Sequence, residues 1–301
     1  MIRFLAALTL GVTLSCSAFA EPALRVLTTF TILQDFVRQV GRDRVEVTTL
    51  VGFDEDAHGF DPRASDIRRL READLLVSNG LGFDAWIERM MLSARFAGVH
   101  VVASAQVTPL EREDEGHGKP DHHHHEHEGN VDPHAWLDVR NAQTYVRTIA
   151  AALIAADPAG KASYEANEAA YLAELAALDD TLRNAFSALP EARRTVVTPH
   201  DAFGYFARAY GLRFLAPAGL SNEAAPSAAA VAELITQLRE HKVDRVYLEN
   251  LTDVRLIERI GKETGATVGG ALYADALSKK DGADTYVGMM TRDMQVLTTA
   301  D

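Results

Sequence analysis

Cysteine is almost absent from this chain, which has one, Cys16, among 301 residues. Cys16 lies within residues 1–20, which have the early cation, the apolar run and the small-x-small ending of a secretory signal peptide. Cleavage after Ala20 would leave a mature chain without cysteine. Such a chain forms no disulfide, and metal sites built on thiolates are excluded.

Long hydrophobic runs are also lacking. The apolar run of residues 4–14 is shorter than the ~20 residues that a membrane-spanning helix needs, and no other stretch is long enough. Lipid attachment at Cys16 is the alternative to cleavage after Ala20, but Thr13 stands where lipoprotein signals usually have Leu. We therefore expect an exported, soluble protein whose signal peptide is removed.

Basic residues are scarce relative to acidic ones. The chain has 30 Lys and Arg against 43 Asp and Glu, a net charge of -13 at pH 7. Such a surface repels nucleic acid and attracts cations weakly. Three catalytic signatures are missing as well: the His-Glu-x-x-His helix, the Gly-x-Ser-x-Gly elbow and a phosphate-binding glycine loop. We expect neither a nucleic-acid partner nor one of these common hydrolase classes.

Histidine, in contrast, is concentrated between residues 115 and 138, where seven of the eleven histidines lie. Residues 113–129 are too polar to bury apolar area and are expected to form a loop. Its imidazoles are candidates for a weak metal site that collects ions: His117, His122, His123, His124, His125 and His127. A hexahistidine tag and a functionless spacer are the alternatives.

The order of expected elements predicts an α/β protein with two lobes. Strands and helices alternate in the first part of the chain, which favours parallel sheets: strands at 24–29, 45–51, 74–78 and 99–103, with helices at 31–40, 66–73 and 85–92. Two helices without a strand between them follow, marked by apolar residues within 142–153 and 171–189. Alternation then resumes, with strands at 194–198, 212–216, 243–249 and 266–272 and helices at 202–210, 228–241 and 254–264. The expected boundaries are an N-terminal lobe at 21–139, a helical connector at 140–190 and a C-terminal lobe at 191–301.

Four polar residues follow predicted strands, where open α/β sheets bind their ligands. His58 and His134 come from the first lobe, and His200 and Asp275 from the second, so their natural meeting place is the cleft between the lobes. Three imidazoles and one carboxylate fill a tetrahedral zinc shell and leave no open position for water. This set predicts binding; a zinc hydrolase with an open site of the same residues is the alternative from another class.

The motifs around these residues resemble those of a known family. They are His58-x-Phe60-Asp61-Pro62, the box Asp132-Pro133-His134-x-Trp136-Leu137-Asp138, the stretch from Thr198 through His200 to Phe206, and Leu272-Tyr273-Ala274-Asp275. They are similar to the cluster A-I, or family 9, periplasmic solute-binding proteins of ABC importers for zinc and manganese. The resemblance implies a long rigid connecting helix and one metal in the cleft. It further implies a periplasmic monomer that delivers its metal to a permease and ATPase at the inner membrane.

In the comparison with this family, the residue at position 200 indicates which metal the protein binds. Manganese members typically carry Glu at this position, whereas a third imidazole makes a softer site that favours Zn²⁺. A manganese receptor of the same family is the alternative. The His-rich loop, typical of zinc receptors in the family, is a candidate contact for a metal-donor protein. Three acidic residues are candidates for orienting the ligand imidazoles: Asp138, Asp201 and Glu249.

Overall fold

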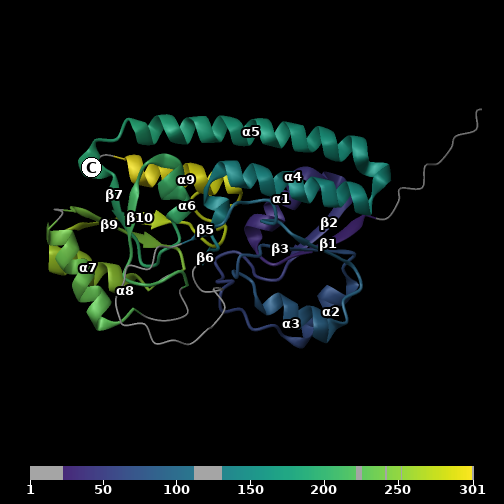
Figure 1. Cartoon of the computed structure of the whole chain (residues 1–301), viewed down its shortest axis with the longest axis horizontal. Helices are drawn as coiled ribbons and strands as arrows, with labels where there is room; N and C mark the ends of the chain where they lie inside the picture. Colours follow the sequence, from purple (N-terminus) through teal and green to yellow (C-terminus); the bar gives the residue numbers. More distant parts are fainter. Residues whose placement is uncertain (1–22, 112–130, 222–225, 241–242, 252, 300–301) are drawn as a thin grey trace, which may run out of the picture.

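A four-stranded parallel sheet organises the first lobe in the computed structural model, which describes residues 23–111, 131–221, 226–240, 243–251 and 253–299. The strands lie in the order β2-β1-β3-β4, with bounds β1 (Leu24–Thr28), β2 (Val45–Thr49), β3 (Leu75–Ser78) and β4 (Val99–Val102). The helices are α1 (Thr31–Gly41), α2 (Ala64–Glu72) and α3 (Trp86–Ala94). In Figure 1, α1 lies on one side of this sheet, and α2 and α3 lie on the other.

The second lobe is also built on parallel strands. Two strand pairs, β7–β8 and β9–β10, lie side by side, with bounds β7 (Thr195–Val197), β8 (Arg213–Leu215), β9 (Arg245–Glu249) and β10 (Thr267–Leu272). Its helices are α6 (Gly204–Tyr210), α7 (Ala228–Glu240), α8 (Val254–Thr264) and α9 (Tyr286–Thr298). Helix α9 was not among the elements expected from the sequence.

Two consecutive helices connect the lobes. Helix α4 (Val139–Ala156) ends at a short turn, and α5 (Lys161–Ser187) then runs back across both lobes (Figure 1). Its 27 residues span about 40 Å at the rise of an α-helix. Helix α5 packs against α1 in the first lobe and against α6 and α9 in the second. The predicted fold class, two α/β lobes joined by a long connecting helix, is therefore confirmed.

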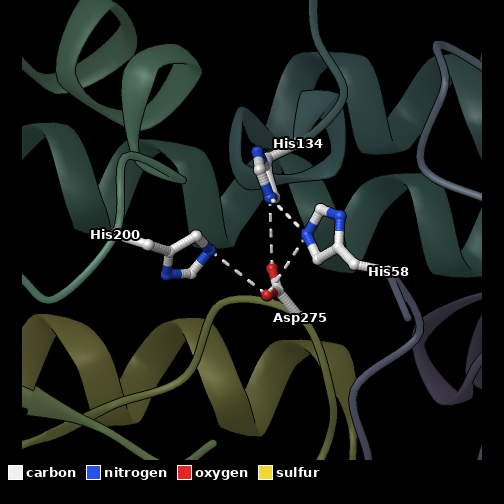
Figure 2. A group of neighbouring side chains, drawn as sticks. All are labelled: His58, His134, His200 and Asp275. Atoms are coloured by element: carbon white, nitrogen blue, oxygen red, sulfur yellow. Dashed lines mark hydrogen bonds and ion pairs between the residues drawn. The ribbon is translucent and has the colours of Figure 1, made fainter. Parts of the chain in front are cut away.

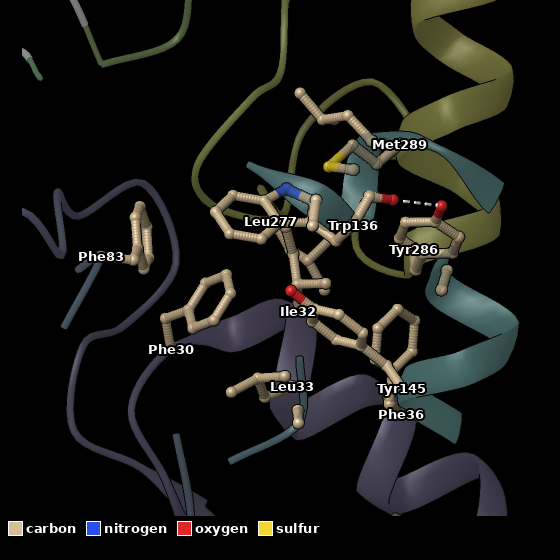
Figure 3. Packing of buried hydrophobic residues seen from close by; sticks show 14 of the residues in the cluster. Phe30, Ile32, Leu33, Phe36, Phe83, Trp136, Tyr145, Leu277, Tyr286 and Met289 are labelled. Carbon is tan, nitrogen blue, oxygen red and sulfur yellow. Dashed lines mark hydrogen bonds between the residues drawn. The ribbon is translucent and has the colours of Figure 1, made fainter. Parts of the chain in front are cut away.

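The main hydrophobic core crosses from one lobe into the other. Figure 3 shows Phe36 of α1 beside Tyr286 of α9, with ring centroids 4.9 Å apart. The indole Nε1 of Trp136 donates to the carbonyl of Ala274 at 2.9 Å, and the Tyr286 hydroxyl donates to the Trp136 carbonyl at 2.7 Å. A second, smaller core lies between α7, α8 and the strands of the second lobe. The segments on both sides of the cleft are thus held by buried contacts.

A short antiparallel pair was missed by the sequence prediction. Strand β5 (Leu110–Glu111) pairs with β6 (Val131–Asp132), on either side of residues 112–130. Two-residue strands leave no alternation of apolar and polar residues to recognise. In the part of the chain that the structure describes, no helix has the length and apolar character required to cross a membrane.

Candidate metal centre

Four side chains converge between the two lobes, where the sequence analysis expected a cleft (Figure 2). Each of His58, His134, His200 and Asp275 offers one ligand atom, and these atoms all lie within 4.8 Å of one another. His134 Nε2 is 3.3 Å from His58 Nε2 and 3.3 Å from Asp275 Oδ1. His200 Nε2 is 3.2 Å from Asp275 Oδ2, and His58 Nε2 is 3.6 Å from it. Zinc–ligand bonds of about 2.0–2.1 Å give a tetrahedron with edges of about 3.3–3.4 Å, and these four separations, three of them measured to one or the other oxygen of Asp275, are close to that length.

Each of the four side chains is presented by a loop next to a strand. His58 lies in the loop after β2, where its backbone N–H donates to Asp56 Oδ1 at 2.8 Å. His134 follows β6, His200 lies between β7 and α6, and Asp275 follows β10. The structure thus brings together the four residues that the sequence singled out, two from each lobe.

Two buried carboxylates orient two of the imidazoles. Asp132 Oδ1 lies 2.8 Å from His134 Nδ1 and also accepts the backbone N–H of His134 at 2.9 Å. Glu249 makes a short contact with His200 Nδ1 and accepts the backbone N–H of His200 at 3.3 Å. A carboxylate at Nδ1 fixes the proton there and leaves the Nε2 lone pair for a metal. In both residues Nε2 points to the centre of the group.

Of the three acidic candidates, Glu249 holds an imidazole in this way. Asp138 instead caps α4 by accepting the Arg140 backbone N–H at 2.9 Å, so that hypothesis was wrong for Asp138. Asp201 directly follows His200, and its backbone N–H donates to the Gly219 carbonyl at 3.0 Å. Asp132 was missed by sequence reasoning. Its place two residues before a histidine, where an Asp carboxylate readily accepts the following backbone N–H, was the available signal.

The site is buried and rich in negative charge. His134 and His200 are 0% exposed and Asp275 is 1% exposed. Burial alone would lower the pKa of His134, but Asp275 and Asp132 outweigh it and raise the pKa to about 9. Burial likewise opposes the charge on His200, yet Glu249 and Asp275 raise its pKa well above the usual value. Burial favours the neutral form of Asp275, but the two imidazoles hold its pKa well below the normal range.

Other candidates fall elsewhere. The histidines of the predicted loop lie outside the described residues: His117, His122, His123, His124, His125 and His127. The expected signal peptide at 1–20 lies outside them as well.

A groove of about 710 Å³ lies in the second lobe between α7 and α8, lined by residues such as Ile235 and Leu256. None of the four cleft residues lines this groove. Among the described residues, one group contains at least three potential metal ligands, and it is the group of His58, His134, His200 and Asp275.

The family can now be stated from comparison with known proteins. A model of the ZnuA family, described as zinc-uptake complex component A, periplasmic, matches residues 26–300. The chain belongs to this family. The high-affinity zinc uptake system protein ZnuA of Bacillus subtilis is 33% identical over 277 residues, covering 91% of this chain and 86% of the relative. The manganese-binding lipoprotein MntA of Halalkalibacterium halodurans is 28% identical over 278 residues, covering 92% and 88%.

A solved structure agrees with this assignment. The periplasmic zinc binding protein TroA from Treponema pallidum superposes with a TM-score of 0.83 at 26% identity, covering 92% of this chain and 98% of that protein. The resemblance seen in the sequence motifs is thus confirmed across nearly the whole chain. This member of the ZnuA family is the substrate-binding protein of a metal ABC transporter and is not an enzyme.

Proposed function

We propose that this protein is a zinc receptor that holds one Zn²⁺ with His58, His134, His200 and Asp275. One observation carries the proposal: three imidazole nitrogens and one carboxylate meet within 4.8 Å of one another. Four protein ligands complete the tetrahedral shell that zinc prefers, which suits a protein that carries an ion without reacting it.

The donor set also supports zinc over manganese. Imidazole suits zinc, whereas manganese prefers carboxylate, carbonyl and water oxygens and stands lowest in the Irving–Williams order. The candidate shell holds three nitrogens and a single carboxylate residue, Asp275. A manganese receptor remains the competing function, because MntA is named for that metal and shares 28% identity with this chain.

The route of the ion follows from the family. We propose that the protein works in the periplasm after removal of residues 1–20 and passes zinc to the permease and ATPase of its importer. Residues 113–129 would collect zinc weakly and receive it from a donor protein. The two lobes, 21–139 and 191–301, would contribute two ligands each, with the connector 140–190 fixing the distance between them.

Competition titration is expected to separate the two metals. One equivalent of zinc should bind far more tightly than manganese, because three imidazoles match zinc and offer manganese few oxygens. The measurement is the apparent Kd for each ion against a chelator of known affinity, on protein stripped of metal. Equal affinities for the two ions would refute the zinc assignment, and no binding of either ion would refute the site.

Replacing Glu249 with Gln should weaken zinc binding by about 10–100-fold, the usual effect of losing a carboxylate partner of a ligand histidine. The amide keeps the size of the side chain but removes the negative charge beside His200 Nδ1. The measurement is the zinc Kd at fixed pH. Asp132→Asn should have a similar effect through His134.

Glu258→Gln is the matched control for this experiment. Glu258 lies on α8 in the same lobe, and its side chain is exposed. Its replacement removes the same charge without touching an imidazole, so zinc affinity should stay at the wild-type value. An equal loss in Glu258→Gln would show that overall charge, and not the orientation of His200, sets the affinity.

A further inference from the structure

Asp54 connects the two lobes near the candidate ligands. It lies four residues before His58, in the loop that follows β2. Its carboxylate accepts hydrogen bonds from the Ser278 hydroxyl at 3.0 Å and from the Asn250 side-chain amide at 3.2 Å. Its backbone N–H donates to the Leu277 carbonyl at 3.1 Å. One residue of the first lobe thus makes three hydrogen bonds to the second lobe.

The partners of Asp54 belong to one segment that carries a candidate ligand and one that carries a residue orienting another. Ser278 stands three residues after Asp275, and Asn250 directly follows Glu249, which holds His200. The adjacent residue, Phe53, also contacts the second lobe, with Lys279 Nζ 5.4 Å from the centre of its ring. Asp54 therefore links the loop of His58 to the segments that position Asp275 and His200.

The backbone at Asp54 is held in an uncommon conformation. Its φ angle is 55°, in the left-handed region that Asp and Asn tolerate better than most residues. Asp54 is exposed, whereas Ser278 is 0% exposed. The side chain therefore reaches from the surface of the first lobe to a buried hydroxyl of the second.

We infer that Asp54 is a positioning residue that slows release of the bound metal. Its hydrogen bonds with Ser278 and Asn250 hold the two lobes together, and we call this set of bonds the clasp. This inference rests on the proposed function, since it takes the four cleft residues as ligands. An ion surrounded by ligands from both lobes leaves only when these ligands separate. Any separation of the His58 loop from the segments at 250 and 278 must first break the bonds to the Asp54 carboxylate.

The test is the rate at which zinc leaves the full-length protein when excess zinc-binding dye is added. Asp54→Gly is the informative deletion, because Gly adopts φ values near 55° without strain, whereas Ala would add a backbone cost of its own. Dissociation should accelerate by about tenfold, as expected for two hydrogen bonds of ordinary net strength. Asp54→Asn keeps an acceptor oxygen and tolerates the backbone, so its rate should lie between those of Asp54→Gly and the wild type.

Two further variants distinguish a clasp from other effects. Asp61→Asn removes the same charge from an exposed position in the same loop and should leave the rate unchanged. Ser278→Ala removes one hydrogen-bond donor. As a single variant it should accelerate zinc release relative to the wild type. Combined with Asp54→Gly it should add little, because the bond between the two residues is already lost. A loop that was merely less stable would lower the melting temperature of the metal-free protein without a specific change in zinc release.

The outcomes are distinct. Wild-type release from both Asp54→Gly and Ser278→Ala would overturn the clasp while leaving the zinc site intact. Equal acceleration in Asp61→Asn would also overturn it, since charge alone would then explain the effect. Failure of the unmodified protein to retain any zinc would instead overturn the proposed function on which the clasp depends.

Discussion

Changing His200 to Ala should weaken zinc binding by more than about a hundredfold. Losing a carboxylate that only orients a ligand already costs about 10–100-fold, so losing the ligand itself should cost more. The replacement leaves three protein ligands and an open position that water can fill. It also leaves Glu249 buried without its imidazole partner. Competition titration with zinc measures the effect, and an unchanged Kd would show that His200 is not a ligand.

Changing His200 to Glu should instead reduce the preference for zinc over manganese, because a harder oxygen ligand replaces a nitrogen. The structure adds a condition that the sequence alone does not reveal. A glutamate at this position would face the Glu249 carboxylate, which now accepts from His200, and two like charges would repel each other in a buried place. The double variant His200→Glu and Glu249→Gln relieves this repulsion. It should therefore bind manganese better than the single variant does.

Competition titration with manganese tests whether Glu249 repels a glutamate at position 200. Equal manganese affinity in the single and double variants would show that Glu249 does not control which ligand position 200 accepts. Glu258→Gln combined with His200→Glu is the matched comparison, since it removes a charge at a distance from the cleft. It should behave like His200→Glu alone.

The four candidate ligands could be predicted from the sequence because each lies in a recognisable motif. His58, His200 and Asp275 also follow predicted strands, whereas the short strand β6 before His134 was missed. Chain topology brings the ends of α/β strands together, and the resemblance of the surrounding motifs to a known family supports the same four residues. The orienting residues were harder to predict. Glu249 reaches His200 across 49 positions of sequence, and the role of Asp138 as a helix cap competes with any role at an imidazole. The contact between Asp132 and His134 Nδ1 could be recognised only once the geometry of the loop was known.

The limits of the fold prediction have similar causes. Helix α9 (Tyr286–Thr298) contains Gly288 in its first turn, which weakens the helical pattern, and its stability comes from packing against α5 and the main core. Its N-terminus is held from the first lobe, because Asp35 Oδ2 accepts the backbone N–H of Tyr286 at 2.8 Å. Contacts between residues separated by 251 positions leave no local signal in the sequence. The clasp at Asp54 escapes sequence reasoning for the same reason.

Zinc binding should weaken steeply as the pH falls below about 9, and not only below the ~6.5 of an ordinary imidazole. The metal-free site keeps protons on His134, whose pKa is raised to about 9, and on His200, whose pKa is also raised. Zinc must displace these protons, because only a neutral imidazole coordinates. Two displaced protons change the apparent Kd by up to about a hundredfold per pH unit. Calorimetry at pH 7 in buffers of different ionisation enthalpy should count about two protons released per zinc.

The stability of the metal-free protein should change with pH in the opposite sense to zinc affinity. A histidine whose pKa is about 9 when folded and ~6.5 when unfolded stabilises the folded state fully below pH 6.5. This contribution is lost as the pH rises from about 6.5 to about 9, because His134 then releases the Nε2 proton that faces Asp275 and keeps the Nδ1 proton that faces Asp132. Zinc replaces that positive charge among the buried carboxylates. The increase in melting temperature caused by saturating zinc should therefore grow between pH 6 and pH 8. A constant increase across this range, together with no proton release on binding, would show that the cleft histidines are already neutral and that the carboxylates do not hold protons on them.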